Sequence, residues 1–238
     1  MRSEHADTFA ALRTAMNIRI EHLTKSYGPQ KAVDDISFEV RPGEVLGFLG
    51  PNGAGKTTTM KMICGLSAPD SGVIEVGGRN IHSDLEAVRK RIGFLPENNP
   101  LYEDMPVLDY LRFTARVQGV KGALIDQRLR EMVEVCGLGP EKHKRIGELS
   151  KGYRQRVGLA QAMVHDPEVL ILDEPTTGLD PNQIVEIREL IKEVGRAKTV
   201  IFSTHILPEV DATCDRILIS NRGRIVAAGA PDLLRTPA

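Results

Sequence analysis

The sequence predicts an α/β fold in which a helical region is inserted into a core built around a sheet. Three observations lead to this prediction. Strand-like runs occur towards both ends of the chain, whereas residues 103–163 are dominated by helical periodicity. A glycine-rich segment follows an apolar run at 44–49 and precedes a helical pattern, as in a strand–loop–helix unit. The 238 residues, 41% of them apolar, are enough for a sizeable core in one large domain or two small ones.

Each expected element follows from the local pattern. Residues 18–23 alternate apolar and polar side chains, as in a half-buried strand, and 44–49 form a continuous apolar run, as in a strand buried on both faces. The expected strands are 18–23, 37–40, 44–49, 73–76, 169–172, 199–202, 216–219 and 225–227. The expected helices are 57–66, 107–117, 124–136, 151–164 and 181–194.

Composition narrows the classes of function. The 31 basic and 32 acidic residues give a net charge of -1, so no general attraction to nucleic acid or an acidic bilayer is expected, although a local patch is compatible with this balance. The three cysteines are far apart and lack CxxC spacing, which argues against a disulfide framework or a zinc site and favours packing as small apolar residues.

The sequence shows neither a membrane-spanning segment nor an N-terminal secretory signal. No apolar stretch approaches the roughly 20 residues of a membrane helix. Residues 1–17 contain charges throughout and no apolar core, so they do not resemble a secretory signal; a flexible tail is favoured over a short amphipathic piece. We expect one domain over 18–234 and a second short tail at 235–238.

The segment from Gly50 to Thr58 matches the phosphate-binding loop GxxxxGK[ST]. Backbone N–H groups can surround a polyphosphate only where side chains are missing, and the following helix adds its positive dipole end. Lys56 is expected to reach the β- and γ-phosphates and Thr57 to bind Mg²⁺, with Thr58 close behind. The alternative is an ordinary glycine-rich turn before a helix; the position after an apolar strand favours phosphate binding.

An apolar strand at 169–172 ends in the carboxylates Asp173 and Glu174. Ligands gather at the carboxyl ends of parallel strands, so Asp173 is expected to hold Mg²⁺ and Glu174 to polarise an attacking water as a general base. A charged strand terminus without function is the alternative. Just before this strand, Ser150 and Gly152 open a helix and form either a second anion site or an ordinary N-cap.

These segments together resemble the nucleotide-binding subunit of an ABC transporter, over roughly residues 18–234. Its markers occur in the family's order, which makes the set specific: Tyr27, the loop 50–58, the segment 95–100, the signature 149–155, Asp173-Glu174, 178–180 and the histidine of 203–205. The resemblance implies a P-loop NTPase core with a mainly parallel sheet, an N-terminal antiparallel β subdomain and an inserted α-helical subdomain.

The resemblance also implies roles for individual residues. Tyr27 would stack on adenine beside Val33, or is simply a surface aromatic; His205 would contact the γ-phosphate, or is a packed or capping histidine. Asp180 would shape the subunit contact and the water site. The implied nucleotide-binding set is Tyr27, Val33, Gly50, Asn52, Gly53, Ala54, Gly55, Lys56, Thr57, Thr58, Ser150, Gly152 and Asp180. The catalytic pair is Glu174 and His205, and the metal set is Thr57, Glu97 and Asp173.

Two departures from the family pattern stand out. Glu97 replaces the usual glutamine near Mg²⁺ and the membrane partner, in a segment that looks like the variant of exporter branches, including gliding-motility and multidrug types. The signature has Lys151 and Tyr153 where the family has a small and a polar residue. Lys151 either adds positive charge near a phosphate or, as we favour, extends into solvent.

The implied function is that of an energy-coupling ATPase with ATP and Mg²⁺ as cofactors. Two copies would enclose two ATP molecules, with Ser150 and Gly152 of one closing on the phosphate loop of the other, and drive a separate membrane permease, in export rather than import. Such a protein would lie peripherally on the cytoplasmic face of the membrane.

Two alternatives are a non-transport ABC ATPase acting on DNA or ribosomes and a small-molecule kinase. The chain lacks the long coiled-coil insertion or tandem cassettes expected of such a non-transport ATPase. Nothing in the sequence suggests the acceptor pocket that a kinase needs. No nucleic-acid partner is expected.

Overall fold

A six-stranded sheet forms the centre of the protein in the computed structural model, which describes residues 15–234. Its strand order is β10-β9-β3-β8-β7-β6, and all neighbouring pairs are parallel except β10 with β9. Its strands are β3 (Val45–Leu49), β6 (Ile92–Leu95), β7 (Val169–Asp173), β8 (Thr199–Thr204), β9 (Arg216–Asn221) and β10 (Arg224–Gly229). The prediction of a mainly parallel sheet is confirmed.

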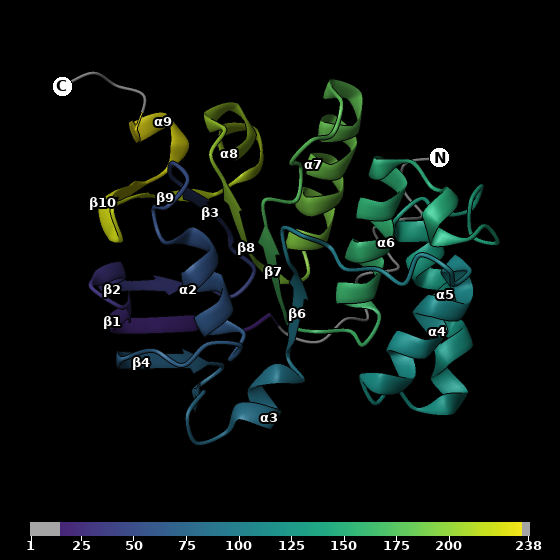
Figure 1. Cartoon of the computed structure of the whole chain (residues 1–238), viewed down its shortest axis with the longest axis horizontal. Coiled ribbons are helices and arrows are strands. Elements are labelled where there is room, and N and C mark those ends of the chain that lie inside the picture. Colours follow the sequence, from purple (N-terminus) through teal and green to yellow (C-terminus); the bar gives the residue numbers. More distant parts are fainter. Residues whose placement is uncertain (1–14, 235–238) are drawn as a thin grey trace.

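A second, antiparallel sheet is built mostly from the N-terminal part of the described chain and has the order β2-β1-β4-β5. Its strands are β1 (Ile18–Tyr27), β2 (Gln30–Val40), β4 (Ser71–Val76) and β5 (Arg79–Asn80). In Figure 1 these purple and blue strands lie on one side of the central sheet. The predicted N-terminal antiparallel part of the fold is therefore present.

The helical region lies on the opposite side of the central sheet in Figure 1, in teal and green. It consists of α4 (Val107–Val117), α5 (Gly122–Val135) and α6 (Lys151–Met163), with the short 3₁₀ helix η1 (Ile146–Glu148) before α6. These elements follow β6 and precede β7, which are neighbours in the sheet. The helical insertion predicted from periodicity is confirmed. The other helices are α2 (Lys56–Ile63), α3 (Leu85–Arg89), α7 (Pro181–Gly195), α8 (Leu207–Thr213) and α9 (Pro231–Leu234).

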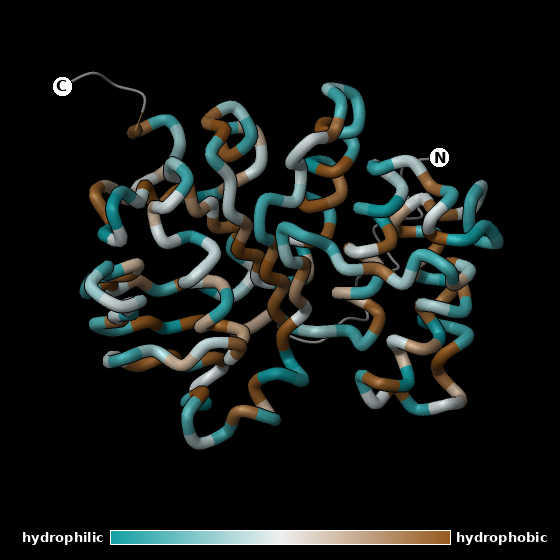
Figure 2. The backbone as a smooth tube through the Cα atoms, in the orientation of Figure 1, coloured by the Kyte–Doolittle hydropathy of each residue, from teal (hydrophilic) through white to brown (hydrophobic). Residues whose placement is uncertain are grey.

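The central strands are buried on both faces, as their continuous apolar sequences predict. In β7, Val169 and Ile171 belong to a hydrophobic cluster shared with the antiparallel sheet, whereas Leu170 and Leu172 belong to the cluster shared with the helical region. Side chains alternate between the faces of a strand, so a strand covered on both sides needs apolar residues at every position. Figure 2 shows hydrophobic residues concentrated along these central strands.

The structure contains short elements that the sequence patterns did not predict, namely β5, β6, α3, η1, α8 and α9. The most consequential is β6, which forms the edge of the central sheet beside β7. It has only four residues, and Gly93 interrupts their apolar pattern, so neither length nor alternation distinguishes it from a loop. The strand before Gly50 and helix α4 lie within one residue of the predicted bounds.

Residues 1–14 and 235–238, which make up most of the two predicted tails, lie outside the described residues. Within the described part, the carbonyl of Met16 accepts a hydrogen bond from Thr199 Oγ1 at 2.6 Å, and that of Asn17 accepts one from Gly77 N at 2.9 Å. All three cysteines are free, and burial raises the pKa of Cys136 to about 12, which fits packing as an apolar residue. Over residues 15–234, no helix combines the length and apolar character needed to cross a bilayer.

Candidate nucleotide-binding site

The glycine-rich loop connects β3 to α2 at the carboxyl edge of the parallel sheet. Gly55 is the N-cap of α2 and has φ +94°, a left-handed conformation that side chains disfavour. A Cβ at Gly55 would also collide with the carbonyl oxygen of Ala32 in β2. The second glycine of the motif is thus required both by its backbone angle and by the close approach of the antiparallel sheet.

Lys56 lies folded over this loop. Its Nζ donates hydrogen bonds to the carbonyl oxygens of Gly50 at 2.7 Å and Pro51 at 3.3 Å. It also lies 3.2 Å from Glu174 Oε1, an ion pair in which both side chains are only 6% exposed. Glu174 Oε1 makes no hydrogen bond in the described chain, so the contact is electrostatic and leaves that oxygen a free acceptor.

A cavity of about 450 Å³ opens above the loop and gathers most of the predicted site residues. Its lining comprises Tyr27, Gln30, Ala32, Asn52, Gly53, Ala54, Gly55, Lys56, Thr57, Thr58, Glu97 and Glu174. Four separate segments, from β1–β2, the loop, the region after β6 and the end of β7, therefore meet at one site. Sequence reasoning missed Gln30 and Ala32; their only signal is that they lie shortly after Tyr27 in the sequence, at the start of the next strand, β2.

Val33, predicted as the apolar neighbour of the base, does not line the cavity. It is 1% exposed and packs in the cluster between the two sheets. Along β2 successive side chains point to opposite faces, so Ala32 and Val33 cannot both face the cavity. The structure places Ala32 at the cavity wall and Val33 beneath it.

Asp173 and Glu174 are joined through Ser203, at the end of the neighbouring strand β8. Ser203 Oγ donates to Asp173 Oδ1 at 2.6 Å and accepts from the backbone N–H of Glu174 at 3.0 Å. Glu174 has φ +50°, an uncommon backbone conformation for a non-glycine residue, of the kind found at functional sites. Ser203 belongs to the marker segment 203–205, in which only the histidine was predicted to have a role.

His205 follows β8 and contacts the same carboxylate. Its Nδ1 lies 3.0 Å from Glu174 Oε2, and Thr177 Oγ1 donates to that oxygen at 3.3 Å. The His205 side chain is 46% exposed, so it reaches Glu174 from the solvent side. The two residues predicted as catalytic are thus in contact with each other and, through Glu174, with Lys56.

The signature residues do not line this cavity. Ser150 is exposed and caps α6 by accepting a hydrogen bond from Tyr153 N at 3.3 Å, while Gly152 is buried against the Gln183 side chain. Asp180 caps α7 and accepts from the N–H groups of Asn182 and Gln183, both at 3.0 Å. Lys151 lies over Gly178, on the loop that leads to Asp180. Within one chain, the signature and the cavity are therefore separate surfaces.

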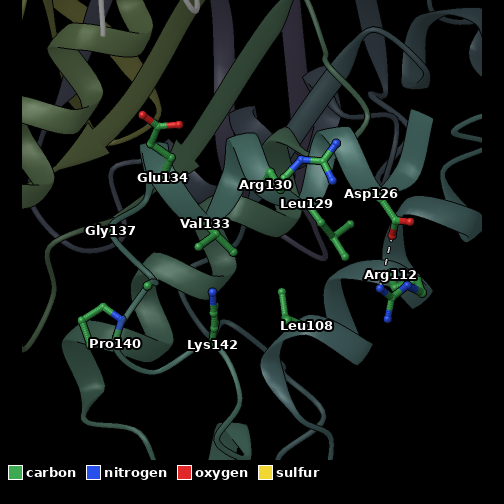
Figure 3. A pocket seen from close by; sticks show the side chains of 11 residues that line it. Leu108, Arg112, Asp126, Leu129, Arg130, Val133, Glu134, Gly137, Pro140 and Lys142 are labelled. Carbon is green, nitrogen blue, oxygen red and sulfur yellow. Dashed lines mark hydrogen bonds and ion pairs between the residues drawn. The ribbon is translucent and has the colours of Figure 1, made fainter. Parts of the chain in front are cut away.

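Another cavity, of about 680 Å³, lies in the helical region and contains none of the predicted site residues. Leu108, Leu129 and Val133 line it, and the ion pair of Arg112 with Asp126 stands at one side, with 3.3 Å between Arg112 Nη2 and Asp126 Oδ1 (Figure 3). This lining contains no glycine-rich phosphate loop, and its Asp126 carboxylate is paired with Arg112. The cavity above the glycine-rich loop is therefore the candidate nucleotide site.

Comparison with known proteins shows the family of this chain. The profile of the ABC transporter family matches residues 33–177, more than half of the chain. The chain belongs to the ABC transporter family. It is an ATP-binding subunit of such a transporter, and it hydrolyses ATP. A second profile, of an AAA domain described as a putative AbiEii toxin of a type IV toxin–antitoxin system, matches only residues 145–212.

Relatives of this ABC ATPase include transport proteins of several bacteria. It is 40% identical over 218 residues to the Nod factor export ATP-binding protein I of Paraburkholderia xenovorans (strain LB400), covering 91% of this chain and 72% of that protein. It is 41% identical over 212 residues to the bacitracin transport ATP-binding protein BcrA of Bacillus licheniformis, covering 88% and 68%. The solved structure of cbiO1 from Clostridium perfringens, part of the transporter complex cbiONQ, superposes with a TM-score of 0.83 at 31% identity, over 91% of this chain and 89% of that one.

Proposed function

We propose that this ABC ATPase binds MgATP in the cavity above the glycine-rich loop, pairs with a second copy around the nucleotide, and drives export through a separate membrane permease. The observation that carries the proposal is the ion pair of Lys56 with Glu174 at the wall of that cavity, with His205 in contact with Glu174. A cation beside a candidate base at the wall of a nucleotide site is what ATP hydrolysis requires.

Lys56 would transfer its contacts from the loop carbonyls and Glu174 to the β- and γ-phosphates. Its ammonium now donates to two carbonyl oxygens and lies 3.2 Å from the Glu174 carboxylate, so phosphate oxygens can replace these contacts without moving the helix that carries it. Release of Glu174 from Lys56 frees its carboxylate to accept a proton from water. His205, in contact with Glu174, would orient this base and contact the γ-phosphate.

The residues at the cavity also fit Mg²⁺. Over residues 15–234 no group of three or more His, Cys, Asp or Glu side chains is placed to hold a metal alone. This suits Mg²⁺, which in nucleotide sites takes one or two carboxylates, a hydroxyl, substrate phosphates and water. Thr57 and Glu97 line the cavity and Asp173 lies behind it, oriented by Ser203. Bound Mg²⁺ would neutralise charge on the β- and γ-phosphates.

The position of the signature supports pairing of two copies. Ser150 is exposed and lies outside the cavity of its own chain, so its helix terminus is available to the ATP held by another copy. An ATP-bound protein would then be a dimer, and hydrolysis would release it.

The helical region offers a surface for the permease. Tyr102, Phe113 and Val117 are exposed large apolar residues, and the Tyr102 and Phe113 rings lie 5.8 Å apart. Tyr102 follows the Glu97 segment, so the chain connects this surface directly to a segment that lines the nucleotide cavity. A permease seated there would place the ATPase on the cytoplasmic face of the membrane. Export is supported by the relatives, one of which is named for Nod factor export.

Light scattering of Glu174→Gln tests the pairing. We expect a monomer without nucleotide or with ADP, and a dimer with ATP. Ser150→Arg in the same background should still bind ATP but stay monomeric, because a bulky cation replaces the cap that faces the second copy. A dimer that forms without ATP, or an ATP-saturated Glu174→Gln protein that stays monomeric, contradicts the proposal.

A second experiment tests the permease surface. Phe113→Glu should abolish co-purification with a co-expressed membrane protein encoded in the neighbouring reading frame. Co-purification of that membrane protein with Phe113→Glu contradicts the assigned surface.

A further inference from the structure

A buried carboxylate without a role in the site described above lies on α8. Glu209 is 2% exposed. Its Oε2 accepts a hydrogen bond from Thr204 Oγ1 at 2.7 Å, and its Oε1 has no hydrogen-bond partner in the described chain. Removing a carboxylate from water costs several kcal/mol unless partners compensate for the lost hydration. A single hydrogen bond from a hydroxyl compensates poorly for the lost hydration. A contribution to the stability of the fold therefore does not explain why a glutamate occupies this position.

The partner of Glu209 belongs to the segment that carries the candidate catalytic histidine. Thr204 and Ile206 flank His205, and the Thr204 hydroxyl accepts from Ile206 N at 3.1 Å while it donates to Glu209. A hydroxyl has one proton, so donation to Glu209 leaves a lone pair directed to the Ile206 N–H. This bond closes a tight turn with His205 at its tip.

The same threonine is tied to the glycine-rich loop. The backbone N–H of Gly50 donates to the Thr204 carbonyl at 3.2 Å, where β8 and β3 end side by side. Thr204 is therefore held at its carbonyl by the phosphate loop and at its hydroxyl by Glu209. Displacement of Thr204 would move His205 relative to both the loop and Glu174.

Helix α8 provides a fixed position for Glu209 because it packs directly on β3. Gly47 of β3 has no side chain, and a Cβ there would lie 2.7 Å from Val210 Cγ1 and 2.6 Å from Cys214 Sγ. The side chains of Val210 and Cys214 therefore pack directly against the backbone of Gly47. A carboxylate on such a helix can act as a rigid support.

We propose that Glu209 is a positioning residue for ATP hydrolysis: it holds the Thr204 hydroxyl and so orients the turn that presents His205 to Glu174. The inference rests on the role of His205 in the proposed function. Glu209 acts through Thr204 and does not itself contact the nucleotide cavity. A buried carboxyl group with a single hydrogen-bond partner is unfavourable for stability, and in this proposal its role is to set the geometry of the histidine.

The test compares variants of Glu209 in the full chain. Glu209→Leu removes the acceptor with little change in volume, whereas Glu209→Gln keeps an oxygen that can accept from Thr204. We expect kcat to fall about tenfold in Glu209→Leu, with KM for ATP and the affinity for a non-hydrolysable ATP analogue within about twofold of the wild type. Glu209→Gln should retain most of the activity. An unchanged kcat in Glu209→Leu overturns the proposal.

A second set of variants separates positioning from structural support. In a His205→Ala background, Glu209→Leu should cause no further loss of kcat, because its effect passes through the histidine. An equal loss in both backgrounds overturns the proposal and leaves the role of His205 intact. Full activity of His205→Ala alone overturns that role and, with it, the inference.

If Glu209→Leu fails to fold, Thr204→Val is used in its place, and Thr204→Ser serves as the control. Thr204→Val is expected to lose kcat and Thr204→Ser to keep it. Equal activity of these two variants overturns the proposal.

Discussion

Lys56 and Glu174 form an ion pair in which Lys56 Nζ and Glu174 Oε1 lie 3.2 Å apart, and each side chain is 6% exposed. The cation of the phosphate loop and the candidate base thus neutralise each other in the protein without nucleotide. In the proposed mechanism ATP separates this pair when it binds, so nucleotide binding and release of the base would be one event. Glu174 would then be unable to act as a base until a phosphate has taken its place beside Lys56.

The pair predicts a specific pattern of stability and binding. Lys56→Ala should lose detectable ATP binding by calorimetry and should also be less stable by about 3 kcal/mol, because Glu174 is left buried without its cation. Adding Glu174→Gln to Lys56→Ala should restore much of the stability but none of the binding. Denaturant unfolding measures the first effect. Unchanged ATP affinity in Lys56→Ala would refute the role of this lysine.

Ser203 is predicted to control the metal requirement. Ser203→Ala removes the only donor that the structure gives to the Asp173 carboxylate within residues 15–234, and it leaves Glu174 N with one acceptor fewer. We expect a stability loss of about 2 kcal/mol and a rise in the Mg²⁺ concentration that gives half-maximal ATP hydrolysis. Ser203→Thr, which keeps the hydroxyl, is the matched control. Identical Mg²⁺ titrations for Ser203→Ala and wild type would show that Asp173 needs no such support.

Asn99 and Gly158 predict an unusual response to an alanine substitution. Asn99, two residues after Glu97, donates to the Arg154 carbonyl of α6 at 3.0 Å, and its side chain lies where a Cβ of Gly158 would be. Glycine to alanine inside a helix normally gains about 1 kcal/mol. Here Gly158→Ala should instead lose about 1 kcal/mol or more, because it displaces Asn99. Asn99→Gly combined with Gly158→Ala should recover stability in urea titrations; a stabilised Gly158→Ala protein contradicts the packing.

Because His165 is buried, we expect the protein to lose stability in mild acid. Burial is the main cause that lowers its pKa from 6.5 to about 4, and the hydrogen bond of Nε2 to the Ile92 carbonyl opposes this shift only in part. Because the folded-state pKa is the lower one, the contribution of His165 is complete above pH 6.5 and is lost as the pH falls from about 6.5 towards about 4. The loss amounts to about 3 kcal/mol.

Urea unfolding across this pH range measures the effect of His165. His165→Gln, which can still donate to the Ile92 carbonyl but does not titrate, should show a flatter dependence between pH 6.5 and 4. Parallel pH profiles for the two proteins would assign the acid sensitivity to other groups.

The sequence by itself determined the glycine-rich loop, the strand before it, the helix after it and the carboxylates that end β7. These features are local: a continuous apolar run predicts a buried strand, and Gly55 with Lys56 predicts a phosphate cradle from neighbours in the chain. The helical insertion was equally visible, since periodicity needs only adjacent turns. Val33 shows the limit of such patterns, because which face of β2 meets the cavity depends on packing against the second sheet.

Only the tertiary structure decided which distant groups touch. Ser203 reaches Asp173 because β8 lies beside β7, and Lys56 reaches Glu174 because β3 follows β8 in the sheet, an order that the sequence does not state. Glu209 acquires its partner only when α8 packs onto Gly47. Strand order and helix docking result from burying apolar surface over the whole domain, so local patterns identify the reactive residues, while the folded core determines which of them meet.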